Sequence, residues 1–244
     1  MSYDVLVRAN AKNMTSEQRK ARSTVRRLNR IRASVEDMQG KIRRDLKSSD
    51  PDRFLTALAV GLMVETNEDP VGWRRSNIEV GEEDWSAFYR NAGKRRAIAN
   101  RDVIQALQTA YETSEDDNDA LFVYDTGKVT AEMVQSYLGK FKLSMKDIQG
   151  HNANRRMRDA LAETRASGPS LPPQKRARTK VLRGEFFQAL DKVADEVGLQ
   201  ADMIRFTYLD PGLEVMYTND GTSAVKTAAC DMAARIAARF LTGS

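Results

Sequence analysis

Two runs of basic residues carry the clearest chemical signal in this sequence of 244 residues. The first run extends from Arg19 to Arg32 without a single acidic residue, and the second follows the Pro172-Pro173 pair. Each phosphate that Lys or Arg neutralises releases counterions, so two such runs favour a nucleic-acid partner. The alternative is that each run is an ordinary solvated face. The residues of these runs that we expect to contact phosphates are Arg22, Arg26, Arg27, Arg30, Lys175, Arg176 and Arg178.

Composition excludes several other kinds of chemistry. The chain has one cysteine, Cys230, and one histidine, His151, which cannot form an internal disulfide or a conventional zinc site. It contains no phosphate-binding loop of the GxxxxGK type, so an NTPase is not expected. No apolar run is long enough to span a bilayer. We therefore expect a cytoplasmic or nucleoid-associated protein with no cofactor, no bound metal and no membrane contact.

The hydrophobic pattern predicts a mainly helical fold with a small β-sheet or hairpin. An apolar stripe predicts a long helix over residues 15–48, and Pro51 is typical of the start of the next helix. A strand is expected over Val71 to Val80, with a hairpin beside it over Phe88 to Ile98. Further helices are predicted over residues 101–113, 130–141 and 144–164. A later helix is expected to end at Gly198, and a last helix is expected around residues 225–240. We divide the chain into a basic arm and long helix, 1–50, and a domain over 51–244 with a linker near 165–180.

Four stretches follow one another along the chain in the same order as similar motifs of a known protein family. They are Leu62 to Glu68, the Gly93-Lys94 hairpin tip, Leu143 to Gln149, and the segment Arg205-Phe206-Thr207-Tyr208-Leu209-Asp210-Pro211 after a helix that ends at Gly198. Together they resemble the catalytic domain of bacterial and poxvirus-like type IB DNA topoisomerases, a fold similar to that of tyrosine recombinases. The resemblance covers roughly residues 20 to 220 and leaves out the family's amino-terminal clamp domain. The resemblance therefore leaves open whether a partner protein supplies the clamp.

The resemblance assigns roles to five positions. Tyr208 stands in the place of the nucleophile that forms a 3′-phosphotyrosyl link, without ATP or metal, and Lys94 stands in the place of the catalytic lysine. The family's two arginines and its histidine are replaced by Val64, Gln149 and Leu199. Loss of one preorganised transition-state donor typically costs on the order of 10²- to 10³-fold in rate. We therefore expect DNA binding with impaired or lost strand cleavage.

Three hypotheses remain open from the sequence. The first is a DNA-binding descendant of a topoisomerase that contacts mainly the phosphate backbone and has become a pseudoenzyme. The second is an active type IB topoisomerase, an isomerase of DNA topology, in which nearby cations replace the missing donors. The third is a helical structural or assembly protein whose basic faces bind nucleic acid. The cations near the affected stretches include Lys146, Arg155 and Arg156, which we also expect to contact DNA, with Arg74, Arg75 and His151 as further candidates.

Overall fold

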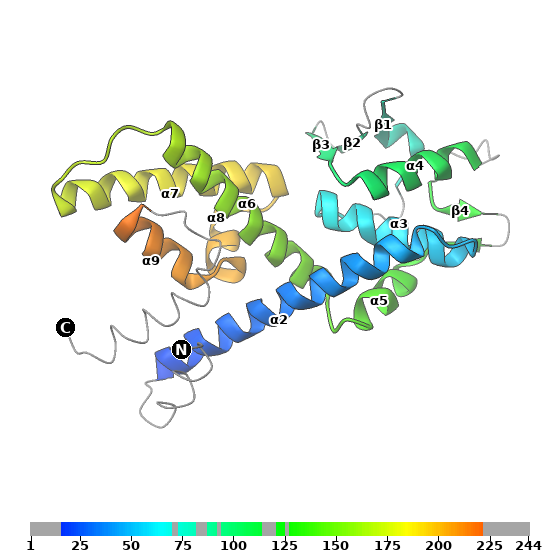
Figure 1. Cartoon of the computed structure of the whole chain (residues 1–244), viewed down its shortest axis with the longest axis horizontal. Coiled ribbons are helices and arrows are strands. Elements are labelled where there is room, and N and C mark those ends of the chain that lie inside the picture. The colour runs from blue at the N-terminus through cyan, green and yellow to red at the C-terminus, as the bar shows by residue number, and fades with distance from the viewer. Residues whose placement is uncertain are drawn as a thin grey trace. The chain divides into compact units, whose positions relative to one another are not determined.

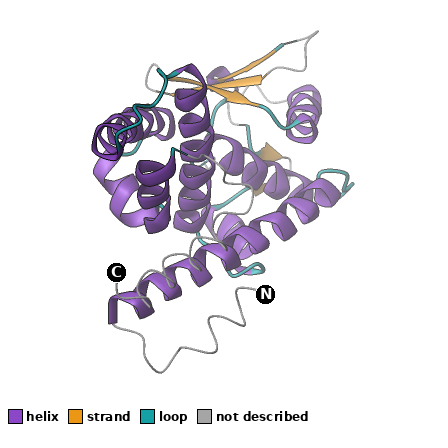
Figure 2. Cartoon of the chain, turned by 60° about the vertical axis from the view of Figure 1, so that its left-hand side comes forward, coloured by secondary structure: helices purple, strands orange, loops and turns teal. Residues whose placement is uncertain are grey.

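The computed structural model describes residues 16–69, 73–81, 87–91, 94–113, 121–124 and 127–221. This part of the chain is mainly helical with a small antiparallel sheet, which confirms the predicted class (Figure 1). Figure 2 shows how few strands accompany the helices. The predicted last helix around 225–240 lies outside the described residues. None of the described helices is long and apolar enough to cross a lipid bilayer.

The chain divides into two compact units. The first unit comprises Met1–Arg32 and Gly150–Ser244, and the second comprises Ala33–Gln149. Helix α2 (Ser16–Asp45) contributes its beginning to the first unit and its remainder to the second. Its buried apolar side chains recur at spacings of three and four residues, which confirms the predicted apolar stripe; they are Ile31, Val35, Met38 and Ile42, followed by Leu46 just after the helix.

The second unit is built around α3 (Pro51–Thr66). Asp50 caps this helix by accepting a hydrogen bond from the Asp52 N–H at 3.1 Å, and Pro51 occupies the first turn, where its missing N–H has no cost. Every residue from Leu55 to Val64 is buried, because α3 packs against α4 (Arg101–Thr113), α5 (Ala131–Gly139) and strand β3 (Lys94–Ile98). Helix α3 is therefore the core of this unit.

A three-stranded antiparallel sheet completes that core. Its strands are β1 (Ile78–Val80), β2 (Ala87–Asn91) and β3 (Lys94–Ile98), in the order β1-β2-β3. The pair Asn91 and Lys94 closes the β2-β3 hairpin, as the sequence predicts. A smaller pair, β4 (Val123–Tyr124) with β5 (Gly127–Lys128), lies between α4 and α5 along the chain. Trp73 stacks on Tyr89 of β2 with ring centroids 3.7 Å apart.

The strand predicted over Val71 to Val80 is wrong for most of its described length. Residues Arg75–Asn77 form a turn of 3₁₀-helix, η2, and only Ile78–Val80 pair in the sheet. The Asn77 side chain accepts a hydrogen bond from the Arg74 N–H at 3.4 Å, which closes the turn locally. Such a side-chain bond competes with the ladder of a strand.

The first unit is helical. It contains most of α6 (Met145–Ser167), all of α7 (Lys175–Val197), the short α8 (Ala201–Met203), the π-helical turn η3 (Ile204–Tyr208) and α9 (Pro211–Asp220). Gly198 ends α7 with a φ of 71°, a left-handed conformation that glycine adopts without strain and that confirms the predicted stop. The core of this unit joins α6, α7, η3 and α9, and its largest fully buried members are Met157, Leu161, Phe186 and Tyr217.

Candidate nucleic-acid interface

Tyr208 is the last residue of η3, and its side chain is 8% exposed. Its ring lies against Gly150 of α6: a Cβ atom at that glycine would be 3.1 Å from the tyrosine Cδ1. The carbonyl oxygen of Tyr208 accepts a hydrogen bond of 2.6 Å from the Nδ2 of Asn154, one turn further along α6. Both the ring and the backbone of Tyr208 are therefore held against α6.

The same asparagine fixes the turn that follows. The Oδ1 of Asn154 accepts a hydrogen bond from the Asp210 N–H at 2.8 Å, and the Asp210 carboxylate accepts one from the Gly212 N–H at 2.9 Å. Asp210 thus caps α9, and Pro211 provides its first helical residue. Buried amide and carbonyl groups need partners, and Asn154 supplies one on each side of Leu209.

Arg158 brings a partly buried positive charge to this turn. It lies one turn beyond Asn154 on α6, and burial lowers the pKa of its guanidinium, with the Asp210 carboxylate opposing that shift and Arg32 adding to it. Burial raises the pKa of the Asp210 carboxyl, while the Gly212 N–H and the charge of Arg158 lower it. The Nε of Arg158 has no hydrogen-bond partner among the described residues.

The other predicted catalytic positions are distributed over both units. In the second unit, Val64 is buried in α3 with 4% exposure, Gln149 is half-buried in α6, and Lys94 opens β3 with a side chain outside the described part. In the first unit, Leu199 follows α7 and packs partly buried against the core that contains Tyr208. The structure therefore brings Leu199 and Tyr208 into one hydrophobic cluster.

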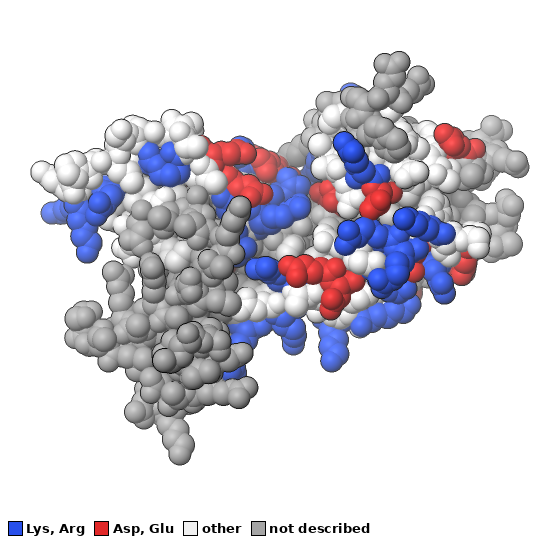
Figure 3. All heavy atoms as spheres, viewed as in Figure 1, with Lys and Arg blue, Asp and Glu red and all other residues white. Residues whose placement is uncertain are grey.

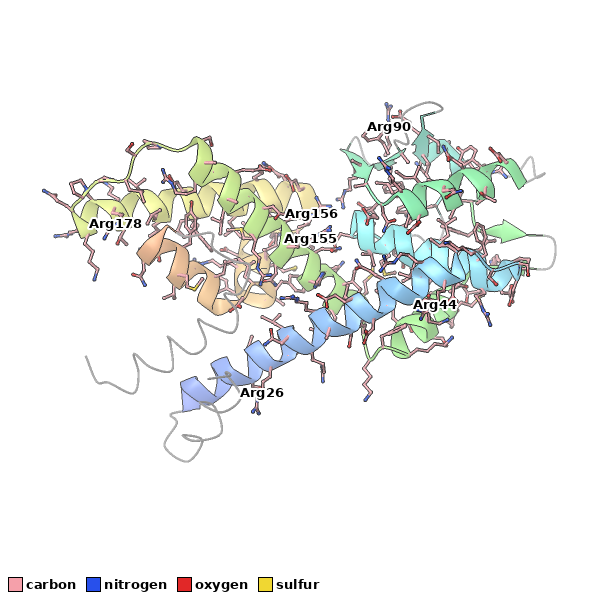
Figure 4. The ribbon with its side chains drawn as sticks, in the orientation of Figure 1. Arg26, Arg44, Arg90, Arg155, Arg156 and Arg178 are labelled. Atoms are coloured by element: carbon pink, nitrogen blue, oxygen red, sulfur yellow. The ribbon has the colours of Figure 1, made fainter. Side chains whose placement is uncertain are left out.

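The predicted basic residues of α6 differ in their surroundings, and Figure 4 labels two of them. Lys146 and Arg155 are exposed, whereas Arg156 is partly buried and pairs with Glu196 of α7 at 3.3 Å. His151 is half-buried. Arg156 therefore contributes to the packing of α6 on α7, and Lys146 and Arg155 remain open to a ligand.

Helix α7 presents its predicted cations on its surface, and Figure 4 labels Arg178 at its beginning. Lys175 is exposed and Arg178 partly buried. Arg176, Lys180 and Arg183 are all exposed and follow one another at spacings of four and three, so they share one face of the helix. We call these three residues the α7 basic stripe. None of them forms an ion pair with any residue that the structure describes.

The beginning of α2 carries a second set of exposed cations in the same unit. Arg26, Arg27 and Arg30 are exposed and, within the described ranges, have no acidic partner, while the side chain of Arg22 lies outside the described part. Figure 3 shows lysine and arginine side chains along α2 and at the beginning of α7. Arginine is suited to phosphate because its planar fork grips two oxygens and keeps its charge.

Sequence reasoning missed Asn154, which holds the backbone of Tyr208, and Arg158, which interacts electrostatically with Asp210. Gly150, Asn154 and Arg158 recur every four residues and so lie along one face of α6, which was a usable signal. It did not stand out, because glycine, asparagine and arginine form no apolar stripe. Among the described residues, no group of three His, Cys, Asp or Glu side chains is placed to hold a metal ion.

No protein-family model matches this chain. No curated protein matches its sequence either.

Proposed function

We propose that this protein binds DNA through its phosphate backbone, using the α7 basic stripe together with Arg26, Arg27 and Arg30 of α2. The observation that supports this most directly is the stripe itself: three exposed cations on one helix face, none paired with a described acid. By contrast, the exposed Lys192 of the same helix pairs with Glu163 of α6 at 2.7 Å. The stripe is left available for an external polyanion.

The proposed contacts are to phosphates rather than to base edges. Arginine and lysine on a helix surface fix a protein on the nucleic-acid backbone, which carries no direct sequence information. Affinity should therefore fall steeply with salt and depend weakly on sequence. The protein's net charge of +5 and pI near 9.3 agree with a polyanionic partner.

We further propose that binding occurs without efficient strand cleavage by Tyr208. An attacking tyrosine oxygen must reach a phosphorus atom, and the side chain of Tyr208 is 8% exposed with its ring against Gly150. Of the donors that the resemblance expects around such a nucleophile, Val64 and Leu199 supply none, and Gln149 supplies a neutral donor in place of a cation. Arg158 interacts electrostatically with the buried Asp210 carboxylate, which opposes the lowering of the arginine pKa by burial. These features favour a structural role for Tyr208.

The test compares two triple charge reversals of equal net charge. The stripe variant carries Arg176→Glu, Lys180→Glu and Arg183→Glu, and the control carries Arg101→Glu, Lys128→Glu and Lys142→Glu at exposed positions of the second unit. Binding to a fluorescein-labelled DNA duplex is measured by anisotropy at low salt. We expect the stripe variant to bind on the order of 10- to 100-fold more weakly. Equal weakening by both variants would show a general charge effect and contradict the assigned surface.

A further inference from the structure

An alternating series of arginines and phenylalanines extends from α7 to η3 in the first unit. The guanidinium carbon of Arg183 lies 5.9 Å from the centroid of the Phe187 ring, and that of Arg205 lies 5.0 Å from the same centroid. Arg205 is also 5.0 Å from the centroid of the Phe206 ring. Cation–π contacts of this kind hold rings and guanidinium groups in a stacked order. Phe206 is the end of the series.

Phe206 is unusually exposed for an aromatic residue. Its side chain is 74% accessible, and the described part of the chain exposes only two other large apolar side chains, Met203 at 44% and Val215 at 45%. All three lie in the short segment that contains α8, η3 and the first half of α9. Exposed apolar groups that cluster in this way commonly mark a binding surface. The π-helical turn that carries Phe206 is a distortion found frequently at functional sites.

Arg205 is held in place by an acidic partner. Its Nε donates to the Glu214 Oε2 at 2.9 Å and its second terminal nitrogen donates to Oε1 at 2.7 Å, a paired contact between guanidinium and carboxylate. The donors of Arg205 are thus directed at α9 rather than at a ligand. Arg205 therefore serves to position the Phe206 ring. The other cation of the series, Arg183, has no acidic partner among the described residues and can contact a phosphate.

The α7 basic stripe continues directly into this series. Phe187 follows Arg183 by four residues, so the helix face that carries Arg176, Lys180 and Arg183 next presents Phe187. A chain of phosphates lying along the stripe would therefore arrive at the exposed ring of Phe206. A row of cations that ends in an exposed aromatic side chain is complementary to a nucleic-acid strand, which offers charge along its backbone and flat rings at its bases.

We propose that Phe206 is a stacking platform for an unpaired nucleobase, so that the preferred ligand is a single-stranded or unpaired region of DNA. This inference rests on the proposed function, because the α7 basic stripe supplies the phosphate contacts that bring the base to the ring. Inside a duplex the faces of each base are covered by stacking on the neighbouring base pairs, so a ring on the protein surface can stack only on an unpaired or terminal base. Stacking is tolerant of sequence because every base has a π-face.

The experiment measures binding of three labelled ligands: an oligo-dT strand, a strand of the same length with abasic sites throughout, and a duplex. Phe206→Ala is compared with Phe206→Trp, which keeps a stacking ring, and with Val215→Ala, which removes a neighbouring exposed apolar side chain. We expect Phe206→Ala to weaken oligo-dT binding about 10-fold and to leave abasic and duplex binding unchanged. Phe206→Trp should retain oligo-dT affinity, and its added indole fluorescence should be quenched on binding.

The outcomes separate this inference from the proposed function. If Phe206→Ala binds oligo-dT as the wild type does while the stripe variant does not, the stacking inference is overturned and DNA binding through phosphates stands. The exposed ring would then belong to a protein-docking surface. If the wild-type protein binds none of the three ligands, both proposals are overturned. Equal weakening by Phe206→Ala and Val215→Ala would also overturn the inference, because it would show a general apolar contact.

Discussion

The Nδ2 of Asn154 donates a hydrogen bond of 2.6 Å to the carbonyl oxygen of Tyr208, across more than fifty residues of sequence. Because its Oδ1 also accepts from the Asp210 N–H at 2.8 Å, this one side chain fixes the backbone between η3 and α9. The segment from Ile204 to Asp210 contains both the predicted nucleophile and the exposed Phe206. Asn154 therefore holds the backbone at Tyr208, two residues after Phe206.

Replacement of Asn154 by alanine should destabilise the first unit by about 2–4 kcal/mol, because it leaves a buried carbonyl and a buried N–H without partners. Urea denaturation followed by circular dichroism measures the change. Arg155→Ala is the matched control, since Arg155 is the next residue of α6 and is exposed. A loss of stability no larger in Asn154→Ala than in Arg155→Ala would show that this amide does not hold the turn.

Tyr217 gives the fold a dependence on alkaline pH. Its hydroxyl donates to the buried Glu185 carboxylate at 2.8 Å, and burial, with this hydrogen bond, raises the pKa of Tyr217 above its ordinary value of 10.0. The folded protein therefore keeps the tyrosine proton at pH values where the unfolded chain releases it. The stabilisation is complete below about pH 10 and is lost as the pH rises above that value.

The Tyr217→Phe variant tests this linkage. At neutral pH it should be about 1–3 kcal/mol less stable than the wild type, because a buried carboxylate loses a donor. This difference should shrink as the pH is raised from 9 towards 11, since only the wild type has a tyrosine to ionise at this position. Thermal or urea denaturation at a series of pH values measures it. A difference that stays constant over this range would contradict the assigned pKa shift.

Supercoiled plasmid should remain supercoiled after incubation with the wild-type protein in the absence of ATP and metal ions. The reason is the burial of Tyr208 and the absence of a cation at Val64 and Gln149, the two positions where the proposed resemblance expects arginine. The reaction is stopped with SDS and analysed on an agarose gel, so that relaxed and covalently trapped DNA are seen together. Relaxation by the wild type that disappears in Tyr208→Phe would identify Tyr208 as an active nucleophile and overturn this part of the proposal.

Several elements could be predicted because their determinants are local. Asp50 and Pro51 start α3, Gly198 ends α7, and the Asn91 and Lys94 pair closes the hairpin, all within a few residues of the signal. The strand expected at Val71 to Val80 was wrong at Arg75–Asn77, also for a local reason. The Asn77 side chain closes a turn on Arg74, and a pattern of apolar residues does not register such a bond.

The arrangement around Phe206 could not be predicted, because it depends on tertiary contacts. Phe187 and Phe206 lie on different elements, and only the fold of the first unit places Arg205 against both rings. Sequence reasoning did identify the cations of α7, but it placed a linker near residues 165–180, and the three residues share a face because all of them belong to one helix, Lys175–Val197. The basic residues of the candidate interface could thus be identified from the sequence, whereas their arrangement around Phe206 could not.

The central claim is that DNA binds through phosphate contacts to the α7 basic stripe, and the salt dependence of binding tests it most directly. Anisotropy titrations of a labelled duplex between about 50 and 200 mM salt give the slope of log K against log salt concentration, to which each phosphate contact contributes roughly −0.9. We predict a clearly negative slope for the wild type, and a slope less steep by two to three units for the variant with Arg176→Glu, Lys180→Glu and Arg183→Glu. Binding that does not change with salt, or an identical slope in the two proteins, would contradict the account.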